Sequence, residues 1–158
     1  YAGLFKNAKK NSLIIDCSTI SPIVAKELNA AGKKVGMNYV DAPVSGGVAG
    51  AEASTLTFMV GAETPQVFNQ AKPILQGMGK SVFNCEKPGA GQIAKICNNM
   101  ALAIQMVSVA EALALGKKLG IDDKILTNIM KVSSSRCWSL DASNPVPGVM
   151  ENVPASIT

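Results

Sequence analysis

The first half of the chain alternates short apolar runs with longer amphipathic ones. The apolar runs are short enough for buried strands and lie at residues 12–16, 38–42, 56–61 and 81–84. Helices are predicted between them, from Ser21-Pro22 to about residue 31 and from Thr64-Pro65 onward, because Ser or Thr before Pro is a typical helix start. Such alternation predicts a mostly parallel sheet with helices on its faces.

The pattern changes at Lys87-Pro-Gly89, after which only helices are predicted. One long helix is expected near residues 90–119, and a second near 122–132 carries two aspartates in its first turn, where negative charge is favoured. The predicted fold class is therefore α/β followed by all-α. We expect a first domain over residues 1–86 and a helical part over residues 87–158.

The long helix is apolar on more than one side. At about 100° per residue, one apolar arc contains Ile93, Ile96, Cys97, Met100, Ile104 and Val107. Leu102, Val109 and Leu113 make the opposite side apolar too. A helix apolar nearly all round is expected to be buried on several sides, and Cys97 is expected in the core.

A polar notch interrupts this helix near its start. Gln92, Lys95 and Asn99 fall in a second arc, roughly 60° wide. Residues four apart share a helix face, so Lys95 and Asn99 can reach one small molecule together. A single lysine is usually a solvated charge, but an apolar helix preceded by two glycines makes that interpretation less expected here.

A second glycine-rich stretch, Ser45-Gly46-Gly47, follows a predicted strand. Its backbone N–H groups can approach an anion closely, and a tight turn that needs positive φ explains the same residues equally well. Ligands of open α/β sheets bind beyond the carboxyl ends of the strands. One crevice could therefore hold this loop, Thr19 and the start of the long helix. Asp16 and Asp41 also end strands, and loop capping is favoured over catalysis for both.

The amino-acid composition limits which catalytic and metal-binding groups the chain can supply. The 158 residues are 47% hydrophobic and 16% charged, which suits one domain or two small ones with a packed core. There is no histidine, so Ser-His and Cys-His nucleophiles are excluded, and the four cysteines are not clustered as a metal site requires. We expect reduced thiols in an intracellular compartment and no bound metal.

Charge and hydropathy exclude two classes of partner. The net charge of +4 comes from scattered lysines without interleaved aromatic residues, so no nucleic-acid partner is predicted. No run approaches the ~18 consecutive apolar residues of a membrane span, so no membrane partner is predicted either.

Taken together, the motifs resemble those of the β-hydroxyacid dehydrogenases. The stretch Asp41-Ala-Pro-Val-Ser-Gly-Gly47, followed by Gly89-x-Gly-x-x-x-Lys95-x-x-x-Asn99, carries the resemblance, which covers essentially the whole chain. It implies the second half of a Rossmann-like doubly wound sheet, then a long interdomain helix and part of a helical substrate and dimerisation domain.

The resemblance also implies a reaction. Family members oxidise a β-hydroxy acid with NAD or NADP, and NAD is expected here. Cys97-Asn-Asn-Met, Arg136-Cys-Trp and Asn144-Pro-Val-Pro-Gly resemble members that convert 3-hydroxyisobutyrate to methylmalonate semialdehyde, a step of valine catabolism. Lys95 would be the general acid/base, and Asn99 would hold the substrate and orient the lysine. A lysine can remove a hydroxyl proton where burial favours its neutral form.

The remaining site residues follow from the same resemblance. Ser45, Gly46 and Gly47 would bind the substrate carboxylate, and Thr19 would lie beside the nicotinamide. A homo-oligomer, dimer or tetramer, is implied, located in the mitochondrion in a eukaryote and in the cytoplasm otherwise.

The chain departs from the family in lacking a G-x-G-x-x-G fingerprint after an early strand. We therefore expect it to be the middle of a polypeptide about twice as long, inactive by itself. Two alternatives stay open: a catalytically silent fragment that acts by association, and an NADP-linked aldehyde reductase on the same scaffold.

Overall fold

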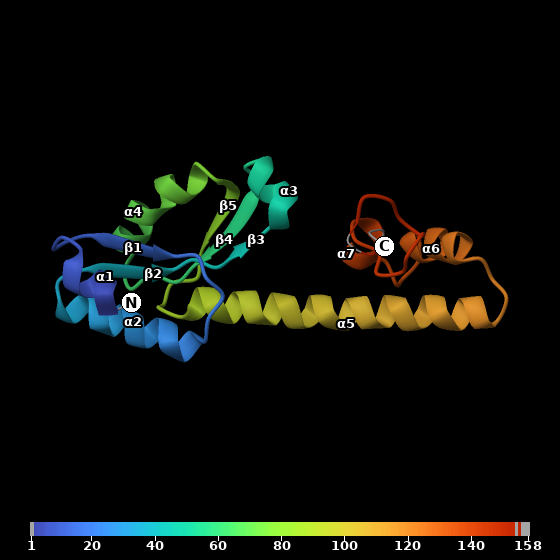
Figure 1. The fold of residues 1–158 in the computed structure, drawn as a ribbon, viewed down its shortest axis with the longest axis horizontal. Coiled ribbons are helices and arrows are strands. Elements are labelled where there is room, and N and C mark those ends of the chain that lie inside the picture. Colours follow the sequence, from blue (N-terminus) through green and yellow to red (C-terminus); the bar gives the residue numbers. More distant parts are fainter. Residues whose placement is uncertain (1, 154, 156–158) are drawn as a thin grey trace. The chain divides into compact units, whose positions relative to one another are not determined.

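The computed structural model describes residues 2–153 and 155 (Figure 1). The chain forms two compact units, residues 1–97 and 98–158, which divide within the long helix. The domain boundary predicted between residues 86 and 87 stays a prediction. The two compact units separate about three helical turns further along the chain.

The first unit alternates strands and helices, which confirms the α/β fold class. Its elements are α1 (Ala2–Asn7), β1 (Leu13–Asp16), α2 (Pro22–Lys34), β2 (Asn38–Asp41), β3 (Val44–Ser45), α3 (Gly47–Glu52), β4 (Leu56–Val60), α4 (Pro65–Gln76), β5 (Gly79–Asn84) and the start of α5 (Ala90–Lys118). In Figure 1, α2 and α4 lie on opposite faces of the strands.

Both predicted helix starts are confirmed. Ser21 Oγ accepts a hydrogen bond from Ile23 N at 3.3 Å, and Thr64 Oγ1 accepts one from Val67 N at 3.3 Å. However, α2 continues past the predicted stop near residue 31, through Gly32 to Lys34. Gly32 is buried, and a Cβ there would lie 3.2 Å from the Phe5 ring, so this glycine permits close packing rather than ending the helix.

The strands form two small sheets joined by an isolated bridge. β1 pairs with β2 in parallel, ending with Asp16 opposite Asp41, and β4 pairs with β5 in parallel. The antiparallel bridge between Asp41 and Gly61 connects the two sheets. The ends of β1, β2 and β4 are thereby brought to one region of the unit.

Two short elements were missed by the sequence pattern. Val44–Ser45 forms β3, antiparallel to β4, and Gly47–Glu52 forms α3, where a loop was predicted. A strand of two residues is too short to show an alternating pattern, and the glycines and alanines of α3 carry no apolar face.

The core of the first unit lies between the strands and α4. Val40, Phe58, Val60 and Leu75 are almost completely buried within it. This packing fixes the carboxyl ends of β2 and β4, directly before Asp41 and Gly61.

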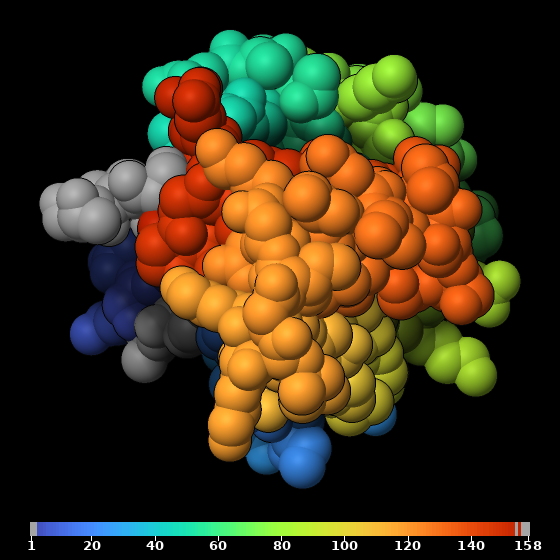
Figure 2. Space-filling view, turned by 90° about the vertical axis from the view of Figure 1, so that its right-hand side faces the viewer, coloured from blue at the N-terminus to red at the C-terminus, as the bar shows by residue number. Residues whose placement is uncertain are grey.

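The second unit contains the remainder of α5, then α6 (Asp123–Lys131) and α7 (Trp138–Asp141). Val109, Leu113 and Leu140 are buried together. Asp122 caps α6 by accepting from Lys124 N at 2.9 Å and Ile125 N at 3.0 Å, which confirms a helix start with two acidic residues. The end of α5 and α6 form the orange surface of Figure 2.

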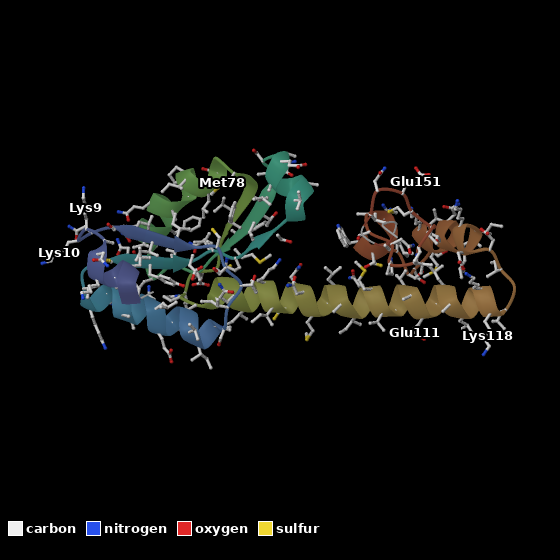
Figure 3. All side chains as sticks on the ribbon, viewed as in Figure 1. Lys9, Lys10, Met78, Glu111, Lys118 and Glu151 are labelled. Carbon is white, nitrogen blue, oxygen red and sulfur yellow. The ribbon has the colours of Figure 1, made fainter. Side chains whose placement is uncertain are left out.

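The prediction that α5 is buried on several sides is wrong for the described residues. The arc that contains Ile93, Ile96, Met100, Ile104 and Val107 is exposed, each side chain by 44% to 63%, and Cys97 is exposed rather than in the core. A shallow hollow of about 340 Å³ on this arc is lined by Ala103, Ile104, Val107 and Ser108. Glu111 is also exposed and points away from α6 and α7 (Figure 3). The helix periodicity identified apolar positions correctly but could not say what covers them.

Among residues 2–153 and 155, α5 is the one helix whose length and apolar composition alone would allow it to cross a membrane. Its first turns, however, are hydrogen-bonded to the α/β unit through Asp41 and Ser18. The most apolar part of the helix is 17% buried, and one such helix is weak evidence of a membrane span, so we assign no membrane role to it.

Candidate active site

The start of α5 is held by the buried carboxylate of Asp41. Its oxygens accept hydrogen bonds from Gly89 N at 2.7 Å and Gln92 N at 3.1 Å, and its backbone carbonyl accepts from Gly61 N at 2.8 Å. Burial raises the pKa of this carboxyl, and the N–H groups of Gly89, Gln92 and Gly91 oppose the rise. The interpretation of Asp41 as a capping residue is confirmed.

The close contacts at position 91 explain why the first turn of α5 needs a glycine there. A Cβ at this position would collide with the Met59 carbonyl oxygen and would lie 2.8 Å from Asp41 Oδ2. The backbone of α5 therefore rests directly on the ends of β2 and β4.

Gln92 joins α5 to the loop after β1. Its side chain is completely buried, with Nε2 donating to Ser18 O at 2.8 Å and Oε1 accepting from Ile20 N at 3.0 Å. The sequence placed Gln92 on the same polar arc as Lys95 and Asn99, and only those two were expected to reach a ligand. The polar atoms of the Gln92 side chain are hydrogen-bonded to the loop backbone.

The same loop is held from its other side by Asp16. Asp16 Oδ1 accepts from Ser18 N at 2.9 Å, and Oδ2 accepts from Tyr39 Oη at 2.8 Å. The capping interpretation of Asp16 is therefore confirmed as well. Thr19, the residue expected at the nicotinamide, lies exposed between Ser18 and Ile20.

Lys95 lies on α5 one turn after Gln92, and it is half-buried, which is less than the sequence led us to expect. The contacts of Gln92 bring the Thr19 loop and the start of this helix together. Asn99 lies one turn further along α5, is exposed, and its Oδ1 accepts from Asn98 Nδ2 at 3.5 Å. The roles of Lys95, Asn99 and Thr19 stay predictions.

The Ser45-Gly46-Gly47 stretch forms a tight turn between β3 and α3. Gly46 has φ +140° and Gly47 has φ +62°, values that L side chains rarely adopt. Ser45 is half-buried, and both glycines are exposed. This geometry explains the two glycines as a turn, while binding of a carboxylate by this stretch stays a prediction.

Lys9, Lys10 and Lys118 point away from the ribbon (Figure 3). Among the described residues, no group of three or more His, Cys, Asp or Glu side chains is placed to hold a metal ion.

Sequence reasoning missed the contacts of Gln92 and the partner of Asp41. Asp41 and Gln92 are 51 positions apart, and Gln92 and Ser18 are 74 apart. The available signal was a polar residue within an apolar helix, at a turn that begins with two glycines. It could indicate a constrained position but not its partner.

Two family models match the chain. The NAD binding domain of 6-phosphogluconate dehydrogenase matches residues 1–86, and the NAD-binding domain of NADP-dependent 3-hydroxyisobutyrate dehydrogenase matches residues 89–153.

Curated relatives align over almost the whole chain. Mitochondrial 3-hydroxyisobutyrate dehydrogenase of Homo sapiens is 53% identical over 154 residues, which are 98% of this chain and 46% of the relative. NAD-dependent L-serine dehydrogenase of Pseudomonas aeruginosa is 47% identical, over 98% of this chain and 51% of that protein. The chain thus spans about half the length of the curated relatives it matches.

A solved structure agrees with these relatives. Mycobacterium tuberculosis 3-hydroxyisobutyrate dehydrogenase, determined with L-serine, superposes with a TM-score of 0.90 at 42% identity, over 99% of this chain and 53% of that one. The fold and the matched domains place the chain in the β-hydroxyacid dehydrogenase family, with a Rossmann-like domain. More particularly, the chain belongs to the 3-hydroxyisobutyrate dehydrogenase family.

Proposed function

We propose that the whole protein is an NAD-dependent dehydrogenase that oxidises 3-hydroxyisobutyrate to methylmalonate semialdehyde, a step of valine catabolism. One structural observation carries the proposal: the buried Gln92 amide joins the Thr19 loop to the helix that bears Lys95. A cofactor loop and a proton-transferring group must be adjacent in any hydride transfer from an alcohol. The 53% identity to the human enzyme supports this substrate class.

The residues present fit the nicotinamide end of a dinucleotide. Thr19 is exposed on a loop directly beyond the carboxyl end of β1, where open α/β sheets bind their ligands. NAD, when bound, supplies the hydride acceptor. The Ser18–Ile20 loop would hold its nicotinamide end, and Gln92 and Asp16 keep that loop in place.

Lys95 would take the hydroxyl proton of the substrate as the carbinol carbon loses its hydride. In the reverse direction the same Nζ would return the proton to the carbonyl oxygen. Asn99, one turn away on the same helix, would hold the substrate and orient the lysine. Ser45, Gly46 and Gly47 would bind the carboxylate, largely through backbone N–H groups.

A second candidate substrate is L-serine. The name of the Pseudomonas aeruginosa relative and the L-serine in the Mycobacterium tuberculosis structure favour it. Both compounds carry a hydroxyl on carbon 3 and a carboxylate on carbon 1, and they differ at carbon 2, in a methyl or an ammonium group. The roles of Lys95 and of the Ser45-Gly46-Gly47 stretch would be the same for either.

The compartment is proposed by resemblance. Relatives from Homo sapiens and Dictyostelium discoideum are mitochondrial by name, and Pseudomonas aeruginosa also has relatives. We propose a mitochondrial location if the source is a eukaryote and a cytoplasmic one otherwise.

The test is a 340 nm assay of the whole protein, with NAD or NADP and with 3-hydroxyisobutyrate or L-serine. We expect the highest kcat/KM for 3-hydroxyisobutyrate with NAD. Lys95→Ala should lower kcat by about 10²- to 10⁴-fold with little change in the Kd of NADH. Lys118→Ala, at the exposed end of the same helix, is the control and should match the unsubstituted protein.

Each alternative predicts a different result at 340 nm. A protein that acts only by association gives no turnover with any pair, and an aldehyde reductase consumes NADPH when an aldehyde is supplied. Activity of Lys95→Ala within about threefold of the unsubstituted protein would remove this lysine from the mechanism.

A further inference from the structure

The Gln92 side chain is a buried bridge between two parts of the first unit that are far apart in sequence. It is 0% exposed, and both of its polar groups are used on backbone atoms of one loop. The two bonded residues, Ser18 and Ile20, are those on either side of Thr19. The position of Thr19 is therefore tied to α5 from both sides.

The chemistry of this bridge requires an amide. Ile20 N is a donor and needs an acceptor, while Ser18 O is an acceptor and needs a donor. A glutamine supplies both from one planar group. Methionine, of similar length, supplies no donor and only a weak acceptor, and an ionised glutamate supplies acceptors only.

Gln92 is itself held in place at its backbone. Its N–H donates to the buried Asp41 carboxylate, so the amide projects from a fixed point at the end of β2. Lys95 follows three residues later, about 4.5 Å along the axis and about 60° around the helix. The residue that binds the loop and the residue that carries the ammonium group are therefore rigidly related.

We propose that Gln92 is a positioning residue that sets the distance between the Thr19 loop and Lys95. Gln92 would take no part in the transfer of the proton or the hydride. It would act by keeping the Thr19 loop and Lys95 at a fixed separation. The inference rests on the proposed function, because it assigns Gln92 to the reaction that Lys95 and Thr19 would share.

The first test measures the loop directly, without cofactor or turnover. Hydrogen exchange of backbone amides is compared between the unsubstituted whole protein and Gln92→Met. Exchange at Ile20 should become faster, because its N–H loses the acceptor. The control is Asn29→Leu, which removes a 3.0 Å hydrogen bond from the side-chain amide Nδ2 of Asn29 to Tyr39 O and leaves both bonds of Gln92 in place. Unchanged exchange at Ile20 in Gln92→Met overturns the proposal.

The second test separates positioning from a general loss of structure. Gln92→Met should lower kcat by about 10- to 100-fold, the usual effect of a small misplacement of reacting groups, with a much smaller change in the KM of NAD. With substrate deuterated at carbon 3, the isotope effect on kcat should rise, because hydride transfer becomes slower than product release. Asn29→Leu should change neither quantity. A kcat and isotope effect equal to those of the unsubstituted protein overturn the proposal.

The third test uses pH and does not depend on the methionine variant folding. A protonated glutamate has one O–H donor and one carbonyl acceptor, the same pair as the amide. The kcat of Gln92→Glu, divided by that of the unsubstituted protein, should therefore rise as the pH falls. A ratio that is independent of pH overturns the proposal.

Lys95→Ala keeps this inference distinguishable from the proposed function. If Lys95→Ala abolishes turnover while Gln92→Met behaves as the unsubstituted protein, the positioning role is wrong and the proposed function stands. If Lys95→Ala is fully active, Lys95 is not part of the mechanism and the positioning role fails with it. If the unsubstituted protein turns over none of the substrate and cofactor pairs, the proposed function fails as well. Faster exchange at Ile20 would then show only that Gln92 holds the loop.

Discussion

At the scale of single residues, this protein uses buried carboxylates as caps for backbone N–H groups. Asp41 caps the start of α5 from the end of β2, and Asp16 caps the loop after β1. Each carboxylate replaces hydrogen bonds that the backbone would otherwise make with water. The two carboxylates therefore stabilise the fold and position the loop after β1 and the start of α5, and we assign neither of them to proton transfer.

We expect Asp41→Ala to be strongly destabilising. Gly89 N and Gln92 N would be left without their acceptor in a buried position, at a cost of about 3 kcal/mol in the free energy of unfolding. The measurement is urea unfolding followed by circular dichroism. The control is Asp122→Ala, which also removes a carboxylate cap from two N–H groups, but at an exposed helix start, and should cost about 1 kcal/mol. Equal costs for the two variants would contradict the buried-cap interpretation.

The cysteines should differ in reactivity with pH. Burial, and secondarily the charge of Asp16, raises the pKa of Cys17, and burial followed by the charge of Asp41 raises that of Cys85. A raised pKa lowers the thiolate fraction at neutral pH, so alkylation of both should be slow there and accelerate as the pH is raised. The exposed Cys97 should react first.

Alkylation with iodoacetamide, followed by peptide mass spectrometry between pH 7 and 10, checks this order. Modification of Cys17 or Cys85 at pH 7 as fast as that of Cys97 would be incompatible with it.

At the scale of elements, the sequence predicted what local chemistry determines. The starts of α2 and α4 were predicted from their capping residues, the start of α6 from its two aspartates, and the main strands from their apolar runs. β3 was missed because its identity comes from pairing with β4, not from its own two residues. The exposed arc of α5 was assigned to a core for a related reason, since periodicity gives a face but not its neighbour.

The seating of α5 on the strands gives an element-scale prediction. Gly91→Ala should displace the helix start, because the new methyl group would collide with the Met59 carbonyl and approach Asp41 Oδ2. The thermal midpoint should fall by several degrees, about 4–8 °C for each kcal/mol in a domain of this size. Gly3→Ala is the matched control: it lies in α1 with open space around the position, so it should be neutral or slightly stabilising.

Differential scanning calorimetry of the two variants provides the comparison. A midpoint for Gly91→Ala equal to that of Gly3→Ala would mean that the helix start does not press against the strand ends.

At the scale of the whole molecule, most of the predicted site residues lie in the first compact unit, which contains Thr19, the Ser45-Gly46-Gly47 stretch and Lys95. The sequence motifs predicted these positions from local spacing along α5 and after the strands. What the motifs could not provide was the long-range bridge made by Gln92.

The exposed arc of α5 favours the predicted homo-oligomer. Five large apolar side chains in succession, from Ile93 to Val107, are each at least 44% exposed, and such surfaces are usually covered in an assembly. We expect the whole protein to be a dimer or tetramer by size-exclusion chromatography with light scattering. Ile104→Asp should shift it toward smaller species, while Ile23→Asp, at an exposed position on α2, should not. A monomeric unsubstituted protein would contradict this prediction.

The bridge from Gln92 has one more consequence, for how the protein can change over evolution. Gln92 is hydrogen-bonded to main-chain atoms, so these bonds do not depend on the side chains of residues 18, 19 and 20. Substitutions of those side chains therefore leave both hydrogen bonds from Gln92 in place. Proline at position 18 or 20 is the exception, because it has no N–H to donate to Asp16 or to Gln92. The loop is thus a suitable site for directed evolution, because hydrogen bonds to its main chain hold it in place whichever side chains it carries.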